Sequence, residues 1–91
     1  MKITLKKPIK VKGKEVTTVI LDFDGITGND LIEAERALRA LGDTSPSAYL
    51  SMKYHAILAT KLLGVPLDDI LEMNAVDFRN VTVAVAGFLL A

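Results

Sequence analysis

The sequence predicts an α+β fold, with an N-terminal β-hairpin followed by a small bundle of three main α-helices plus a short helical turn. A change in the apolar pattern supports this prediction. Up to residue 24 apolar and polar side chains mostly alternate, as in strands, whereas from residue 27 apolar side chains recur every three or four positions, as in helices. A chain of 91 residues has room for one domain. We therefore expect a single domain over residues 1–91, with the hairpin in residues 1–24 and the helical part in residues 27–91.

The first strand is predicted over residues 2–12, because most of its odd positions are apolar and its even positions are mostly lysine. A second strand is predicted over residues 16–23, after a short glycine-containing connection at residues 13–15. The alternation gives the first strand one apolar face and one face lined by lysines, namely Lys2, Lys6, Lys10 and Lys12.

The register of the hairpin follows from keeping the apolar side chains of both strands on one face. Pairing Lys12 with Val16 achieves this for most of them and places Ile9 opposite Val19. Pro8 has no backbone N–H to donate to a neighbouring strand. We therefore expect the first strand to lie at an edge of the sheet or to carry a bulge at Pro8.

The first helix is predicted to begin at Thr27, because Thr27 and Asp30 form the pattern of a capping box. Its apolar residues then recur at helical spacing, and Gly42 is expected to end it. The second helix is predicted to open with Ser45 as cap and Pro46 in its first turn, and to end at Gly64.

Two further helical segments are predicted in the last third of the chain. Pro66 starts a short piece whose first turn contains two aspartates, which the helix dipole favours. Asn74 and Asp77 offer a cap for a last helix running from Ala75 to the end. The valines of its second half also alternate as in a strand, but the cap and the length favour a helix. The apolar run at residues 81–91 is too short to span a membrane, which needs about 20 residues.

The charges are divided unevenly along the chain. Residues 1–14 hold six lysines and no acid, a charge of +6, while residues 15–91 hold five basic and eleven acidic side chains, a charge of −6. A nucleic-acid-binding domain usually has an overall basic excess, so this distribution argues against nucleic acid as a partner. It favours pairing between oppositely charged parts of two copies, and therefore a homo-oligomer. The absence of cysteine suits a reducing cytoplasm.

One short segment resembles an enzyme motif. An apolar strand ending in Asp22-x-Asp24-Gly is similar to the first motif of haloacid-dehalogenase-type phosphatases, which implies Asp22 as nucleophile and Asp24 as general acid/base beside Mg²⁺. Lys53 or Lys61 and the aspartates 68–69 are the candidates for the distal groups. The resemblance covers nine residues, and that fold needs several parallel strands, so a turn at residues 22–27 is the favoured interpretation. The only histidine, His55, is expected to be a packing residue.

Two surfaces are the candidates for partner binding. The C-terminal helix is apolar on nearly all its sides, so part of it is expected to meet another chain, through Val81, Val85, Phe88 and Leu89. The alternative, that it is the central core helix, stays open. The lysine face of the hairpin is the second candidate, through Lys2, Lys6, Lys10 and Lys12; protection of an edge strand is the alternative for these lysines.

The order of the segments resembles a known family, the small tail assembly chaperones of tailed bacteriophages and prophages. The similarity is carried by residues 5–9, 13–14, 16–21, 27–31, 64–71 and 77–78, and by the apolar end through Leu90. It implies a non-enzymatic cytoplasmic protein, without cofactor, metal or membrane, that holds the tape measure protein soluble during tail tube assembly. Such proteins often have a longer form made by translational frameshifting. The alternatives are a homo-oligomeric structural adaptor and, less favoured, the phosphatase-like hydrolase.

Overall fold

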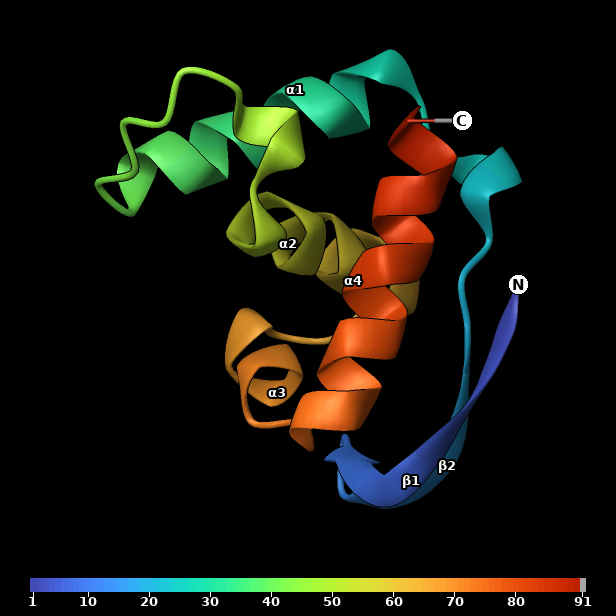
Figure 1. The fold of residues 1–91 in the computed structure, drawn as a ribbon. Coiled ribbons are helices and arrows are strands. Elements are labelled where there is room, and N and C mark those ends of the chain that lie inside the picture. The colour runs from blue at the N-terminus through green and yellow to red at the C-terminus, as the bar shows by residue number, and fades with distance from the viewer. Residues whose placement is uncertain (91) are drawn as a thin grey trace.

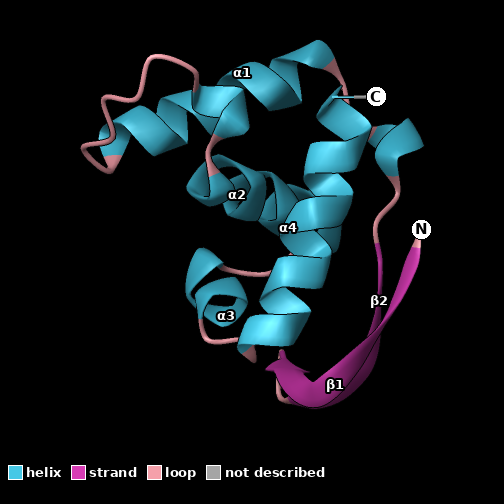
Figure 2. Cartoon of the chain, viewed as in Figure 1, coloured by secondary structure: helices cyan, strands magenta, loops and turns pink. Residues whose placement is uncertain are grey.

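The computed structural model describes residues 1–90, with the exception of the Tyr49 side chain. Figure 2 shows a two-stranded hairpin followed by helices, so the predicted α+β class is confirmed. The elements, in chain order, are β1 (Lys2–Val11), β2 (Lys14–Ile20), the 3-10 turn η1 (Phe23–Gly25), α1 (Gly28–Ala40), the 3-10 turn η2 (Ala48–Leu50), α2 (Met52–Leu63), α3 (Leu67–Leu71) and α4 (Ala75–Leu90).

Helix α2 is the centre of the fold. It contacts α1, α3 and α4, and in Figure 1 α4 crosses in front of it while α1 and α3 lie at opposite ends of α4. All six consecutive residues 54–59 are buried, which requires neighbours on every side of the helix. The hairpin lies along the other side of α4 and contributes Leu5, Val19 and the adjacent Leu21 to the same core.

The hairpin has a different register from the predicted one. Its turn is the two-residue Lys12-Gly13, with φ of 54° and 80°, the positive values that a type I′ turn requires. Ile9 therefore pairs with Val16 rather than with Val19, and Val19 pairs with Ile3. The predicted register was wrong because it placed the turn at residues 13–15.

The first strand carries a bulge at the position that Pro8 predicted. The register shifts between Thr4 and Ile9, where the strand has more residues than its partner. The backbone N–H groups of Lys6 and Lys7 leave the ladder and donate to the Asp77 carboxylate of α4, at 2.7 and 3.0 Å. This buried carboxylate therefore fastens the bulge to α4. The predicted cap at Asn74 is present, because its side-chain oxygen accepts a hydrogen bond from the Val76 N–H at 3.0 Å.

The helix boundaries test the predicted caps. Thr27 and Asp30 form the expected capping box of α1, which ends at Ala40, just before Gly42. Gly64 ends α2 in the left-handed conformation, with φ of 67°, as predicted. The short helix after Pro66 is confirmed as α3, and the last helix is confirmed as α4 up to Leu90. The predicted end of that helix, Ala91, lies outside the described residues.

The start of the second helix was predicted wrongly. The helix begins at Met52, with Ser51 as its cap, and not at Ser45 and Pro46. The Asp43 carboxylate accepts a hydrogen bond from the Ser45 N–H at 2.8 Å, which holds this segment in a turn. Hydrogen bonding to Ser45 keeps the pKa of the Asp43 carboxyl below its usual value, helped by nearby Arg39.

Tyr54 joins α2 to α1 through its hydroxyl, which donates to the Leu31 carbonyl oxygen at 2.9 Å. Burial raises the pKa of Tyr54, with a smaller contribution from Glu35. We expect Tyr54→Phe to lower the free energy of unfolding by about 1 kcal/mol, because the hydrogen bond is lost while the ring still packs. Urea unfolding followed by circular dichroism measures this, and an unchanged midpoint would mean that the bond contributes nothing.

Candidate partner-binding surface

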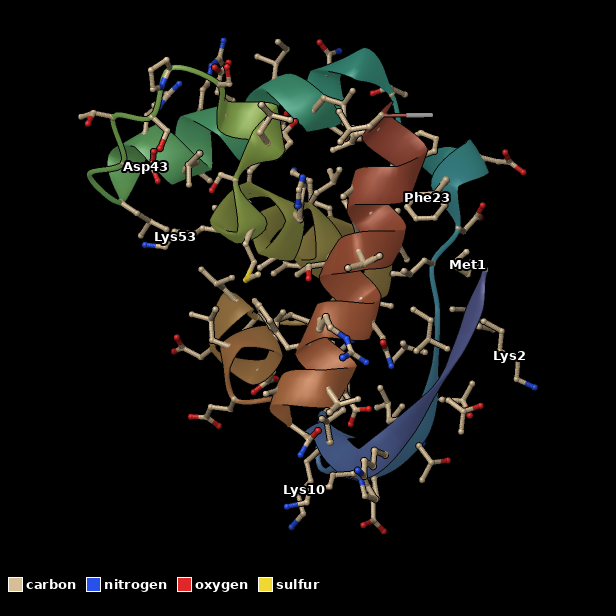
Figure 3. The ribbon with its side chains drawn as sticks, in the orientation of Figure 1. Met1, Lys2, Lys10, Phe23, Asp43 and Lys53 are labelled. Atoms are coloured by element: carbon tan, nitrogen blue, oxygen red, sulfur yellow. The ribbon has the colours of Figure 1, made fainter. Side chains whose placement is uncertain are left out.

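The lysine face of β1 is exposed, as the alternation predicted. Lys2, Lys6 and Lys10 of β1 are exposed, and so is Lys12 in the turn that follows, whereas Leu5 is buried. Figure 3 shows the side chains of Lys2 and Lys10 pointing away from the helices. None of the ion pairs formed within residues 1–90 includes one of these lysines. The face can therefore offer positive charge to a partner.

The predicted binding residues of the C-terminal helix lie in two different environments. Val81 and Val85 are fully buried against the core of the same chain. Leu89 is partly buried, and Phe88 is 41% exposed. The structure thus does not bring these four residues together on one open surface.

Phe88 has a partner within the chain. Its ring stacks on that of Phe23 in η1, with ring centroids 4.5 Å apart and planes inclined by 7°. Figure 3 shows the Phe23 side chain pointing from η1 toward the end of α4. Stacked pairs of this kind contribute about 0.5–1.5 kcal/mol beyond their buried area. Phe88 therefore fixes η1 onto α4 and leaves only part of its ring to solvent.

Sequence reasoning missed other exposed apolar side chains. Besides Phe88, the large apolar side chains within residues 1–90 that are exposed are Met1, Ile20, Ile32, Leu41, Leu50, Met52, Leu71, Val83 and Leu90. Val83 and Leu90 lie on α4, directly after the buried Thr82 and the partly buried Leu89. Helical phase could have distinguished the two faces only if the side of α4 that meets the core had been known.

The groups of the phosphatase-like segment lie apart. Asp22 and Asp24 are exposed, and Asp22 accepts a hydrogen bond from the Asp24 N–H at 3.1 Å, as in the turn that was favoured. The segment lies beside the C-terminal end of α4, while the aspartates 68–69 belong to α3 near its other end (Figure 1). Within residues 1–90 no group of three or more His, Cys, Asp or Glu side chains could hold a metal ion.

The structure also places the remaining candidate residues, Lys53, Lys61 and His55. Lys61 on α2 pairs with Glu33 on α1 at 2.7 Å, and this hydrogen bond raises the pKa of Lys61. Lys53 lies near the Asp43 turn in Figure 3. His55 is buried beside Tyr54, with the two rings 6.2 Å apart in an edge arrangement. His55 is thus a buried packing residue, Lys61 joins α2 to α1, and Lys53 is exposed.

Comparison with known protein families gives a match that covers almost the whole chain. A family model described as phage tail assembly chaperone proteins, E, or 41 or 14, matches residues 2–90. No curated protein and no solved structure matches. Within residues 1–90 every helix is too short or too polar to cross a membrane.

Proposed function

Because this chain belongs to the family of phage tail assembly chaperone proteins, we propose that it binds the tape measure protein and keeps it soluble while the tail tube assembles. The binding is stoichiometric and involves no catalysis, and it takes place in the cytoplasm of the bacterial host. The tape measure protein is a long helical protein with apolar stripes, so its holder must offer apolar surface to helices.

The observation that carries this proposal is the exposure of large apolar side chains on so small a chain. Val83 is 61% exposed, Met52 57% and Leu90 54%. These residues lie on α4 and at the start of α2, two helices that contact each other. Where exposed apolar side chains form a continuous patch, they commonly mark a protein–protein interaction site. A chaperone of helical segments needs such a surface.

Charge separation supports a second, related role, the formation of a homo-oligomer. The lysine face of β1 lies at the outside of the hairpin, while α1 and α3 carry exposed acids. Of these, Glu33 is already paired with Lys61, whereas Asp68 takes part in no ion pair within residues 1–90. In a homo-oligomer the hairpin of one copy meets these acidic helices of the next. Exposed ion pairs are screened by salt, so such an oligomer dissociates as the salt concentration rises.

Co-expression with the tape measure protein of the same genome tests the main proposal. We expect the soluble fraction of the tape measure protein to rise severalfold and the two proteins to co-purify. An unrelated aggregation-prone helical protein, expressed in the same way, serves as the control for nonspecific effects. An unchanged soluble fraction without co-purification would contradict the proposal.

A further inference from the structure

Helix α4 carries a continuous row of residues that face away from the core. Ala75, Arg79, Val83, Ala86 and Leu90 follow one another at intervals of three or four positions, so they lie along one side of the helix. Four of the five are exposed, and Ala86 is partly exposed. Apart from Arg79 the row is apolar. We refer to these five residues as the α4 row.

A groove lies at the foot of the α4 row. It has a volume of about 360 Å³ and is lined by Met52, Leu71, Met73, Ala75, Phe78 and Arg79. Ala75 and Arg79 belong to both features, so the groove and the row form one uninterrupted surface. Methionine side chains are flexible and polarisable, and they adapt to apolar side chains of different shapes. The groove therefore suits a partner whose contacting residue varies from one binding segment to the next.

The geometry points to a docking site for an amphipathic α-helix of the tape measure protein. We propose that such a helix lies along the α4 row, inserts one large apolar side chain into the groove and places a carboxylate opposite Arg79. This inference rests on the proposed function, since it specifies where and how the partner binds.

Charge identifies the partner as an acid-bearing helix. The Arg79 guanidinium donates to the Asn80 side chain at 3.3 Å, and within residues 1–90 no ion pair includes it. A guanidinium at the centre of an apolar surface forms strong, often bidentate, hydrogen bonds to a carboxylate. The α4 helix of a second copy cannot supply that group, because its only acid, Asp77, is 1% exposed and already accepts two hydrogen bonds.

The size of the surface also favours a segment of a long partner over a stable dimer. From Ala75 to Leu90 the row is about 22 Å long, and a helix is about 10 Å wide, so the contact covers roughly 220 Å² on each side. Stable dimers bury about 800 Å² per partner. A single contact of this size is weak and reversible. A long helical protein can engage many chaperone copies in this way and release them as the tube subunits arrive.

Binding of overlapping 18-residue peptides that span the tape measure protein, measured by fluorescence anisotropy, tests the docking site. We expect the bound peptides to combine an apolar stripe with an Asp or Glu. Val83→Glu should weaken their binding about tenfold or more, because it removes apolar contact and adds a charge at the centre of the row. Ile32→Glu, at a similarly exposed position on α1, is the matched control and should leave binding unchanged.

Arg79→Ala separates the charge contact from the apolar one. It should weaken the binding of an acidic peptide several-fold, while the same peptide with its acid replaced by Gln binds wild type and variant alike. Circular dichroism establishes that each variant keeps its helices.

Three outcomes would overturn the docking site. Equal binding by the Val83→Glu and Ile32→Glu variants places the site elsewhere. Loss of self-association in Val83→Glu, seen by sedimentation with peptide binding intact, makes a second copy the occupant. If Val83→Glu still keeps the full tape measure protein soluble, the docking site is wrong and the chaperone function stands. If wild type fails in that assay, the chaperone function itself is wrong.

Discussion

Replacing Asp77 with alanine is expected to lower the free energy of unfolding by about 3 to 5 kcal/mol. The Asp77 carboxylate is almost completely buried, and it accepts the backbone N–H groups of Lys6 and Lys7. Removing it leaves both amides at the bulge without an acceptor and removes the hydrogen bonds that fasten the bulge to α4. Since small domains have only about 5–15 kcal/mol of stability in total, the variant should be close to unfolding.

Urea unfolding followed by circular dichroism gives the size of this effect, with Asp68→Ala as control. Asp68 is exposed in the first turn of α3, so its loss should cost less than about 1 kcal/mol. Asp77→Asn keeps one acceptor oxygen, so its loss of stability should lie between those of Asp77→Ala and Asp68→Ala. In Asp77→Ala, hydrogen exchange at the Lys6 and Lys7 amides should also become faster. Equal stabilities of the two alanine variants would show that the bulge does not depend on Asp77.

Replacing Val85 with alanine is expected to lower the free energy of unfolding by about 2–3 kcal/mol. The side chain of Val85 is completely buried in the core, so deleting two methyl groups removes packing contacts and leaves a cavity. The higher helix propensity of alanine offsets only a few tenths of a kcal/mol, or about 0.5 at most.

The matched control for this variant is Val83→Ala, two residues away in the same helix and 61% exposed. It should change the stability by less than about 0.5 kcal/mol, or raise it slightly, because propensity is then the main contribution. Thermal and urea unfolding of the pair measures the difference. If both variants lose equal stability, α4 does not have the core face and the open face described above.

The local sequence was sufficient for features that depend on neighbouring residues. The capping box of Thr27 and Asp30 satisfies backbone groups at the start of α1 whatever the rest of the chain does, and Gly64 tolerates the left-handed conformation that ends α2. Pro8 marked the bulge because it lacks a donor in every fold. These predictions were confirmed.

Predictions failed where two local solutions were nearly equal. In isolation, Ser45 followed by Pro46 is as good a helix start as Ser51. In the folded chain the Ser45 N–H instead donates to the Asp43 carboxylate, which favours a turn there. The turn at Lys12-Gly13 requires a positive φ at a lysine, which sequence propensity disfavours. The hairpin forms this turn despite its cost, and the turn position sets the pairing of the two strands.

The candidate surface was the least predictable part. The lysine face of β1 follows from a period of two and was predicted correctly as an exposed face, although its partner stays a prediction. The C-terminal helix is apolar on almost every side, so its sequence did not indicate which side packs against the core. Val81 and Val85 turned out to belong to the core, and the row that contains Val83 and Leu90 is the open side.

By itself the sequence determined the α+β class, the order of the elements, most helix ends and the separation of positive and negative charge, because these depend on spacing and on chemistry between neighbours. Only the tertiary structure decided the hairpin register, the role of Asp77 and the open face of α4. Each of these depends on contacts between segments distant in the chain. Lys6 and Asp77, for example, are 71 residues apart, and the N–H of one meets the carboxylate of the other only after folding.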